Sequence, residues 1–105
     1  MNVNVDVPVL ECLRALGEPL RWRIAELLAG EELCVCHLVE ELGAPQSLVS
    51  HHLRVLRDAG LVEAERFRYW TYYRIRPPAL AALGELLGDL AHGSPAPGAR
   101  RRACC

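Results

Sequence analysis

Hydrophobic side chains recur three or four residues apart in four successive segments of the chain, and a glycine closes each segment. Side chains with that spacing share one face of a helix, so each segment predicts an amphipathic helix. Proline suits the first turn of a helix, and glycine suits the position where it stops. With these residues as boundaries, the predicted helices cover residues 9–16, 19–30, 34–42 and 45–60.

The second half of the chain predicts a different structure, because many of its apolar residues are β-branched or aromatic. Residues 61–76 predict the two strands of a hairpin, whose turn near residues 66–68 lacks glycine and asparagine. Two prolines end the hairpin, and a last helix follows with leucines at heptad-like spacing: Leu80, Leu83, Leu87 and Leu90. Residues 93–105 are rich in Gly and Pro, which predicts a flexible tail after a domain of residues 1–92.

Together these elements predict a mainly α fold with about five helices and a small β-hairpin. The third and fourth helices, joined by a short turn, form a helix-turn-helix pattern. The chain has 105 residues, 51% of them hydrophobic, which suits one domain. Charges interrupt the apolar runs, so no segment qualifies as a membrane span, and the first residues lack the features of a signal peptide. We therefore expect a cytoplasmic protein with no membrane partner.

Arginines gather beyond the middle of the chain, although the formal net charge is only −1. Residues 44–76 hold six arginines and three acidic residues, whereas residues 1–43 hold three arginines and eight acidic residues. All twelve basic residues are Arg, whose forked guanidinium can make paired contacts to phosphate or guanine. A basic zone around a helix-turn-helix pattern favours nucleic acid as the partner.

The fourth predicted helix carries a polar face that is nearly free of acids, opposite the apolar positions Val49, Leu53 and Leu56. Such a face suits insertion into the major groove of double-stranded DNA, and the arginines of the hairpin suit adjacent phosphates or the minor groove. The alternative is an ordinary solvated surface. No combination of acid, base and nucleophile indicates an enzyme. The predicted DNA-contacting residues are Gln46, Ser47, Ser50, His51, Arg54, Arg66 and Arg68.

Two thiols, Cys34 and Cys36, lie only one residue apart at the start of the third predicted helix. Five cysteines in a reducing compartment favour metal or redox chemistry over a disulfide framework. Residues two apart on an ideal helix point to nearly opposite sides. If both sulfurs bind one ion, the first turn of this helix must therefore be distorted.

Four segments carry a resemblance to a known family: "GEPLRWRIAELL", "ELCVCHL", "PQSLVSHHLRVLRDAGLV" and "YWTYYRI". Over residues 8–90 the chain resembles the ArsR/SmtB family of metal-sensing bacterial repressors. The resemblance implies a homodimeric winged helix-turn-helix protein that binds operator DNA when empty and leaves it when a metal or metalloid binds. It also places Gln46, Ser47, Ser50 and His51 on the DNA-reading helix.

The resemblance further implies that Cys34 and Cys36 bind the ion, with As(III) as the first choice and Cd(II) or Pb(II) as the second. A helix N-terminus favours thiolate, and thiolate selects soft ions. The chain departs from the arsenic branch, since His37 replaces an acidic residue and Val39 replaces a third cysteine. We expect His37 to be a solvated polar residue. The candidates for a third ligand are Cys12, Cys104 and Cys105.

Two alternatives compete with metal sensing. The first keeps the fold and makes thiol oxidation the signal. The second is a thiol-rich metal-binding protein without a DNA role, which leaves the arginine hairpin unexplained.

The leucines of the last helix form an apolar seam that predicts packing against a symmetry mate in a two-fold dimer. The alternative is that this seam folds back on its own domain.

Overall fold

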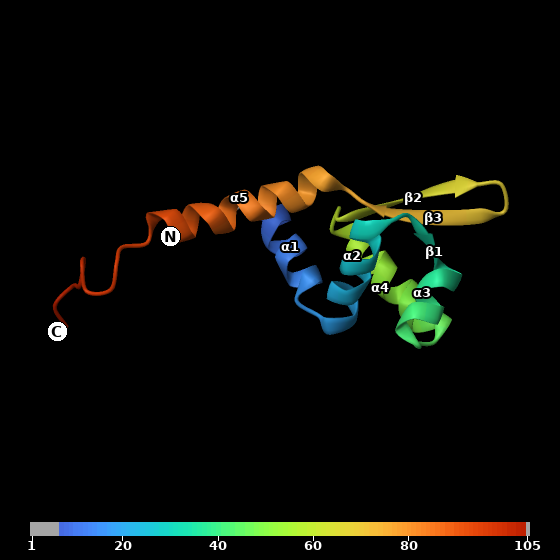
Figure 1. Cartoon of the computed structure of the whole chain (residues 1–105), viewed down its shortest axis with the longest axis horizontal. Helices are drawn as coiled ribbons and strands as arrows, with labels where there is room; N and C mark the ends of the chain where they lie inside the picture. Colours follow the sequence, from blue (N-terminus) through green and yellow to red (C-terminus); the bar gives the residue numbers. More distant parts are fainter. Residues whose placement is uncertain (1–6, 105) are drawn as a thin grey trace.

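Helices form most of the protein, and a small sheet lies beside them (Figure 1). The computed structural model describes residues 7–104. Its helices are α1 (Val7–Leu16), α2 (Pro19–Gly30), α3 (Val35–Leu42), α4 (Gln46–Asp58) and α5 (Pro77–Gly93). Its strands are β1 (Leu33–Cys34), β2 (Val62–Phe67) and β3 (Trp70–Ile75), which form an antiparallel sheet in the order β1-β3-β2. The five predicted helices and the hairpin are confirmed.

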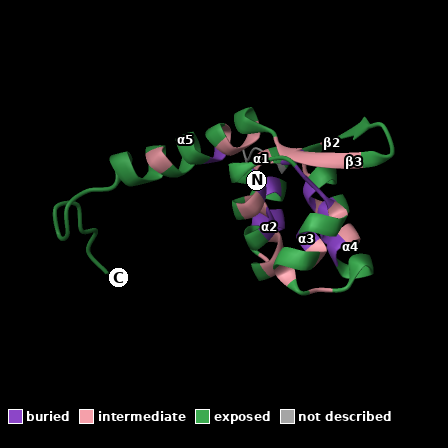
Figure 2. Ribbon diagram, turned by 45° about the vertical axis from the view of Figure 1, so that its right-hand side comes forward, coloured by how far each residue is buried: buried purple, intermediate pink, exposed green. Residues whose placement is uncertain are grey.

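The hydrophobic core joins the first four helices to the root of the sheet, where Figure 2 shows the buried segments. Val49, Leu53 and Leu56 of α4 are all buried, as the apolar face of this helix predicts. Ile24 of α2 and Leu38 of α3 are fully buried beside them. Burial of one such side chain contributes about 1.5–3 kcal/mol, so this core fixes α4 firmly against its neighbours.

The helix-turn-helix consists of α3 and α4, and its boundaries follow the predicted signals closely. Gly43 ends α3 in the left-handed conformation, with φ of 61°, and its N–H donates to the carbonyl of Val39 at 2.9 Å. Pro45 is the N-cap of α4. The helix ends at Asp58, and Gly60 then adopts a φ of 82° that turns the chain toward β2.

The short strand β1 was not predicted. Leu33 pairs with Tyr73 and Cys34 pairs with Tyr72, so β1 adds a third strand to the hairpin. Cys34 is extended, with φ of −90° and ψ of 169°, and α3 therefore begins at Val35 instead of Cys34. The buried Leu33 side chain anchors this strand in the core, an interaction that helical periodicity along the chain does not reveal.

The hairpin of β2 and β3, which we call the wing, turns at Arg68 and Tyr69. Arg68 has a positive φ of 60°, as tight hairpin turns require, although it is not a glycine. At the root of the wing the guanidinium of Arg74 lies against three carboxylates: Glu32, Glu63 and Glu65. This arginine ties β2, β3 and the segment before β1 together, so it serves the sheet itself.

The leucine seam of α5 divides into a buried half and an exposed half. Leu83 is buried and Leu80 is half-buried, and this part of the helix packs against the core and α1. Leu87 and Leu90 are exposed where α5 extends away from the other helices (Figure 1). The seam thus folds back on its own domain only at its start.

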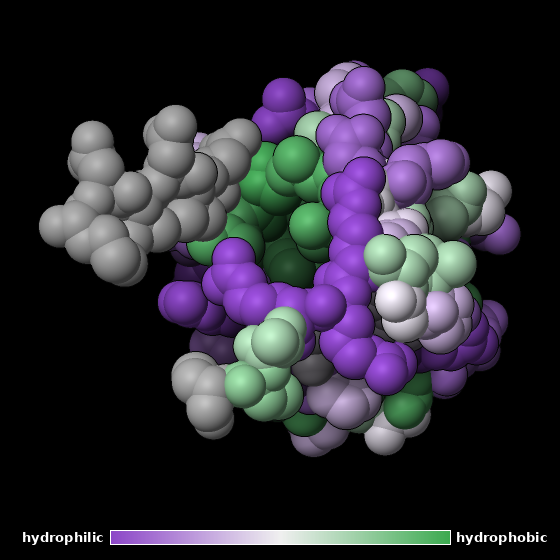
Figure 3. Space-filling model, turned by 90° about the vertical axis from the view of Figure 1, so that its left-hand side faces the viewer, coloured by the Kyte–Doolittle hydropathy of each residue, from purple (hydrophilic) through white to green (hydrophobic). Residues whose placement is uncertain are grey.

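Exposed leucine side chains gather on α1 and on α5, the two helices that pack against each other. Seen from the C-terminal end, the surface has a hollow lined by hydrophobic side chains (Figure 3). The exposed leucines of α1 and α5 are Leu10, Leu13, Leu86, Leu87 and Leu90. After α5, residues 94–104 contain neither helix nor strand and are exposed. Within residues 7–104, no helix combines the length and apolar character that crossing a membrane requires.

Candidate metal centre and nucleic-acid interface

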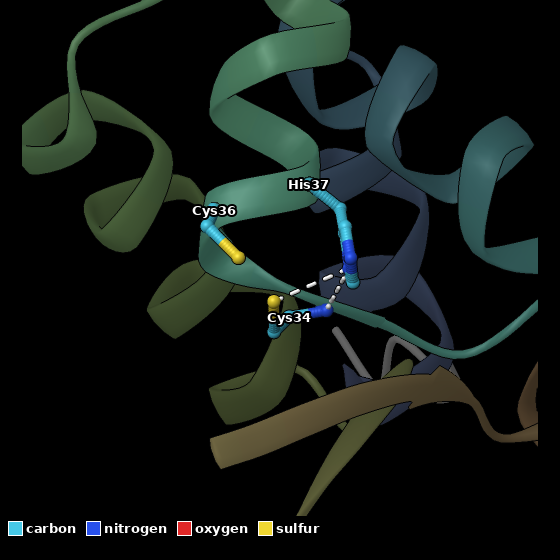
Figure 4. Close-up of side chains that lie close together, drawn as sticks. All are labelled: Cys34, Cys36 and His37. Carbon is cyan, nitrogen blue, oxygen red and sulfur yellow. Dashed lines mark hydrogen bonds between the residues drawn. The ribbon is translucent and has the colours of Figure 1, made fainter. Parts of the chain in front are cut away.

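Three side chains of the kinds that bind metal ions meet where β1 passes into α3. Cys34 closes the strand, Cys36 lies in the first turn of the helix, and His37 follows it. Their ligand atoms, two sulfurs and one imidazole nitrogen, all lie within 4.8 Å of one another. The two sulfurs face each other, and the imidazole ring approaches Cys34 from the other side (Figure 4). Thiolate with imidazole is a donor set that suits soft and borderline ions.

The thiols converge without any distortion of α3, which answers the difficulty that their spacing raises. Cys34 is the extended N-cap of the helix and is not part of its first turn. Its side chain therefore does not follow the helical rotation that would separate it from Cys36. The distorted turn expected from the sequence is not needed, because the strand–helix junction brings the sulfurs together.

His37 has a more specific position than its predicted role as a solvated residue. Its ring is exposed, but Nδ1 accepts a hydrogen bond from the backbone N–H of Cys34 at 3.1 Å. The same nitrogen lies 3.2 Å from the Sγ atom of Cys34. The N3 side chain of a helix often bonds to the N-cap N–H, so this position three residues after Cys34 was a signal that could have identified His37.

The two thiols differ in acidity. Burial raises the pKa of the Cys34 thiol, but hydrogen bonds with the Cys36 side chain and with backbone groups of residues 34, 36 and 37 outweigh it and lower the pKa below its usual value. The hydrogen bond to Cys34 raises the pKa of Cys36, with desolvation and the negative charge of Cys34 adding to the effect. Cys34 is therefore the first of the pair to become a thiolate.

The other predicted thiol ligands lie elsewhere in the chain. Cys12 is buried in the core, and its Sγ donates to the carbonyl of Ala59 at 3.0 Å. Cys104 is exposed in the tail, which Figure 1 places at the opposite end of the long axis from β1 and α3. Cys105 lies outside the described residues. Within one chain, the described structure thus brings together Cys34, Cys36 and His37, and brings neither Cys12 nor Cys104 to them.

A cavity of about 440 Å³ opens beside the two thiols. Val35 and Val39 of α3 form one wall, and Tyr69 and Trp70 at the tip of the wing form another. Gln46, the first residue of α4, also lines it. The cavity therefore touches the thiol site, the helix-turn-helix and the wing at once.

The polar face of α4 is available to a partner. Gln46, Ser47, His51 and Arg54 are exposed, and Ser50 is half-buried. On the wing, Arg66 and Arg68 are both exposed, and the Arg68 guanidinium lies over the ring of Phe67, 5.5 Å from its centroid. Their exposure fits a DNA-contacting role, which stays a prediction for these seven residues.

His52 is the buried polar residue that the sequence did not single out. Arg21 of α2 donates from Nη1 toward His52 Nδ1 at 3.1 Å, and from Nε to the carbonyl of Ala15 at 2.6 Å. Glu18, the N-cap of α2, lies 3.8 Å from His52 Nε2. Because α4 holds His52 between these groups, the network fixes α4 to the start of α2. The available signal was the sequence position of His52, because its helical spacing from Val49 and from Leu56 places it on the buried face of α4.

The His52 network makes folding stability depend on pH. Burial lowers the pKa of His52 in the folded protein, whereas in the unfolded chain it keeps its ordinary value of 6.5. Below that pH the unfolded state binds more protons than the folded state. The contribution of His52 to the free energy of unfolding is therefore complete above pH 6.5 and is lost as the pH falls toward the lowered pKa. Urea unfolding measured above and below pH 6.5 should show that the free energy of unfolding falls less with acidification in His52→Gln than in the wild type. Equal losses in the two proteins would contradict the assignment.

Residues 18–64 match the family model described as bacterial regulatory protein, arsR family. An uncharacterized HTH-type transcriptional regulator of Methanocaldococcus jannaschii is 37% identical over 81 residues, which cover 76% of this chain and 91% of that protein. The HTH-type transcriptional repressor SmtB of Mycobacterium tuberculosis is 42% identical over 82 residues, covering 78% of this chain and 59% of SmtB. The chain therefore spans less than two thirds of the length of this repressor.

Solved structures share the fold as well. The crystal structure of a possible transcriptional regulator for arsenical resistance has a TM-score of 0.70 and 38% identity, covering 76% of this chain and 83% of that chain. The homodimeric winged helix-turn-helix DNA-binding domain of a possible ArsR-family regulator from Mycobacterium bovis has a TM-score of 0.67 and 33% identity, covering 81% and 79%. The predicted winged helix-turn-helix fold is confirmed.

Proposed function

The chain belongs to the arsR family of bacterial regulatory proteins, whose members are DNA-binding transcriptional regulators and not enzymes, and on that premise we propose that it is a thiol-based metalloid sensor. In this proposal a cytoplasmic homodimer represses transcription by binding operator DNA when its thiols are empty. It leaves the DNA when As(III), or alternatively Cd(II) or Pb(II), binds to Cys34 and Cys36.

The thiol–imidazole cluster at the start of α3 is the observation that carries the proposal. Two sulfurs and a nitrogen within 4.8 Å of one another fit a soft ion, and two thiolates are stronger ligands for such an ion than surface carboxylates. The proposed ion-binding residues lie at the N-cap and in the first turn of α3, the first helix of the helix-turn-helix, so the signal would reach the DNA-binding element directly. Names of relatives that mention arsenical resistance agree with this choice of inducer.

The third ligand depends on the ion. Within one chain His37 Nδ1 is the nearest further donor, and nitrogen suits Cd(II) better than As(III), which prefers sulfur. The alternative is a thiolate from a second subunit, supplied by Cys12, Cys104 or Cys105. Cys12 would first have to leave the core and give up its hydrogen bond to Ala59.

For DNA binding, the proposal places the polar face of α4 in the major groove and the wing on the neighbouring backbone. Five exposed or half-buried polar residues occupy that face, and Arg66 and Arg68 occupy the wing. Because one cavity touches Cys36, Gln46 and Trp70, an ion on the thiols can shift α4 and the wing relative to each other. That shift is the proposed route to release.

Arg54→Ala and His51→Ala should each weaken operator binding without unfolding the protein. Both side chains are exposed on α4, on the side opposite its buried face of Val49, Leu53 and Leu56, so their loss should remove contacts to DNA and leave the core intact. A lost base or phosphate contact costs on the order of 1–3 kcal/mol. Fluorescence anisotropy of a labelled operator duplex measures the change.

Arg23→Ala is the matched control, because it removes an exposed arginine from α2. It should bind the operator like the wild type. Unchanged operator affinity in both α4 variants would show that this helix does not lie in the major groove.

The proposed function is tested by adding arsenite to the protein–operator complex under full reduction. Release under these conditions supports metalloid sensing, and release only after oxidation supports the thiol-redox alternative. If the protein binds the ions but no DNA duplex at any salt concentration, the proposed repressor role is wrong and the metal-binding alternative stands. Cadmium and lead titrations in the same assay rank the ions.

A further inference from the structure

The cavity beside the thiols is larger and more apolar than an ion needs. Its volume of about 440 Å³ lies within the range of small-molecule sites, whereas a bare ion fills only a small part of it. Val35, Val39 and Trp70 line it with hydrophobic surface. Trp70 and Tyr69 are exposed at its edge, so their aromatic surface is largely uncovered by other side chains of the described residues.

The number of sulfurs is also informative. Trivalent arsenic forms three bonds, and the described chain brings only two thiols, Cys34 and Cys36, to this site. Imidazole nitrogen is a poor replacement for the third thiolate, because As(III) prefers sulfur. An arsenic atom that already carries one carbon substituent has two exchangeable positions left, which equals the number of thiols.

We propose that this site is selective for trivalent arsenic bearing one organic substituent, with the arsenic on Cys34 and Cys36 and the substituent in the cavity against Trp70. This inference rests on the proposed sensing function and specifies its inducer. The ligand class is a monosubstituted arsonous acid, R–As(OH)₂, in which R is an alkyl or aryl group.

Binding is a ligand exchange that needs no oxidant or reductant. Two arsenic–sulfur bonds form and two arsenic–oxygen bonds break, while the two thiol protons leave with the hydroxyl groups as water. Arsenic stays trivalent, and its bond to carbon is untouched. The carbon group then lies on the side of the thiols where Val39 of α3 and the aromatic tip of the wing face the cavity.

The test compares phenylarsonous acid with arsenite on the whole 105-residue chain in its reduced form. Dissociation constants are measured by competition against a small dithiol, so that DNA binding does not enter the result. Trp70→Ala removes the aromatic wall, and Phe67→Ala is the matched control. Phe67 lies opposite Trp70 in the same hairpin and is similarly exposed, at 59% against 55%, but it does not line this cavity.

We expect the preference for phenylarsonous acid over arsenite to fall roughly tenfold in Trp70→Ala, because an aromatic contact is lost with the buried surface. Phe67→Ala should keep the wild-type preference, and arsenite affinity should stay the same in both variants. Circular dichroism confirms that each variant is folded. Tyr69→Ala, at the edge of the same wall, provides a second variant and should reduce the preference in the same direction.

The failure of this inference differs from the failure of the proposed function. An unchanged preference in both Trp70→Ala and Tyr69→Ala overturns the cavity proposal and leaves arsenic sensing intact. If the Cys34→Ser/Cys36→Ser double variant binds both arsenicals like the wild type, the thiol site itself is wrong. Loss of preference in the wall variants, with no release of operator DNA, keeps the binding site and overturns its regulatory role.

Discussion

Cys34→Ser and Cys36→Ser proteins should bind the operator like the wild type but stay bound at arsenite or cadmium concentrations that release the wild type. Hydroxyl oxygen is a poor ligand for soft ions, so each substitution removes one of only two sulfurs in the cluster. Serine keeps the size of the side chain, and Cys36 is exposed, so the fold should persist. Operator anisotropy titrated with arsenite measures the loss, which we expect to be complete in the double variant.

Cys104→Ser tests the tail as the source of a third thiolate, since it removes an exposed thiol that lies far from the cluster within one chain. If the tail supplies no ligand, its inducing concentration matches the wild type. Cys12→Ser separates the alternative in which the first helix supplies the third thiolate, because the inducing concentration then rises sharply. Should the double variant leave the operator at the wild-type arsenite concentration, the Cys34/Cys36 pair is not the sensor.

Leu87→Glu combined with Leu90→Glu should convert a dimer into monomers and remove most of the operator affinity. Both leucines are exposed, Leu90 at 71%, and lie on the half of the α5 seam that does not fold back on the core. Burying a leucine contributes about 1.5–3 kcal/mol, and a two-fold interface buries each residue twice. Charged side chains at these positions instead repel their symmetry mates. Sedimentation at micromolar concentration measures the change.

Ala81→Glu is the matched control for charge on α5. A rotation of about 100° per residue places it with Glu85 on the polar side of the helix, away from the seam. It should sediment as a dimer and bind the operator normally. A wild-type protein that sediments as a monomer and still binds the operator tightly would argue against the dimer altogether.

The periodicity of hydrophobic residues was sufficient to predict the helices and the hairpin. Val49, Leu53 and Leu56 are buried as expected, because an amphipathic face has few alternatives in a domain of this size. Gly43 ends α3 where predicted, since its left-handed conformation favours glycine. These features depend on neighbours in the sequence, which is why the sequence alone reveals them.

The features that periodicity missed depend on residues far apart in the chain. β1 forms because Cys34 pairs with Tyr72, a partner 38 positions later in the numbering, and two residues are too few to show a strand pattern. The cavity needs α3, α4 and the wing to meet. His52 is buried because Arg21 and Glu18 accompany it, and only their position in space explains a buried imidazole.

The Arg74 cluster at the root of the wing gives the hairpin an electrical polarity. At the root, Glu32, Glu63 and Glu65 stand against Arg74 and Arg76, which leaves one negative charge in excess, while Arg66 and Arg68 make the tip positive. In the field of a polyanion such a hairpin experiences a torque that turns its tip inward and its root outward. In the proposed arrangement on DNA, the acidic residues of the wing would therefore influence the angle at which the protein approaches a double helix without contacting it.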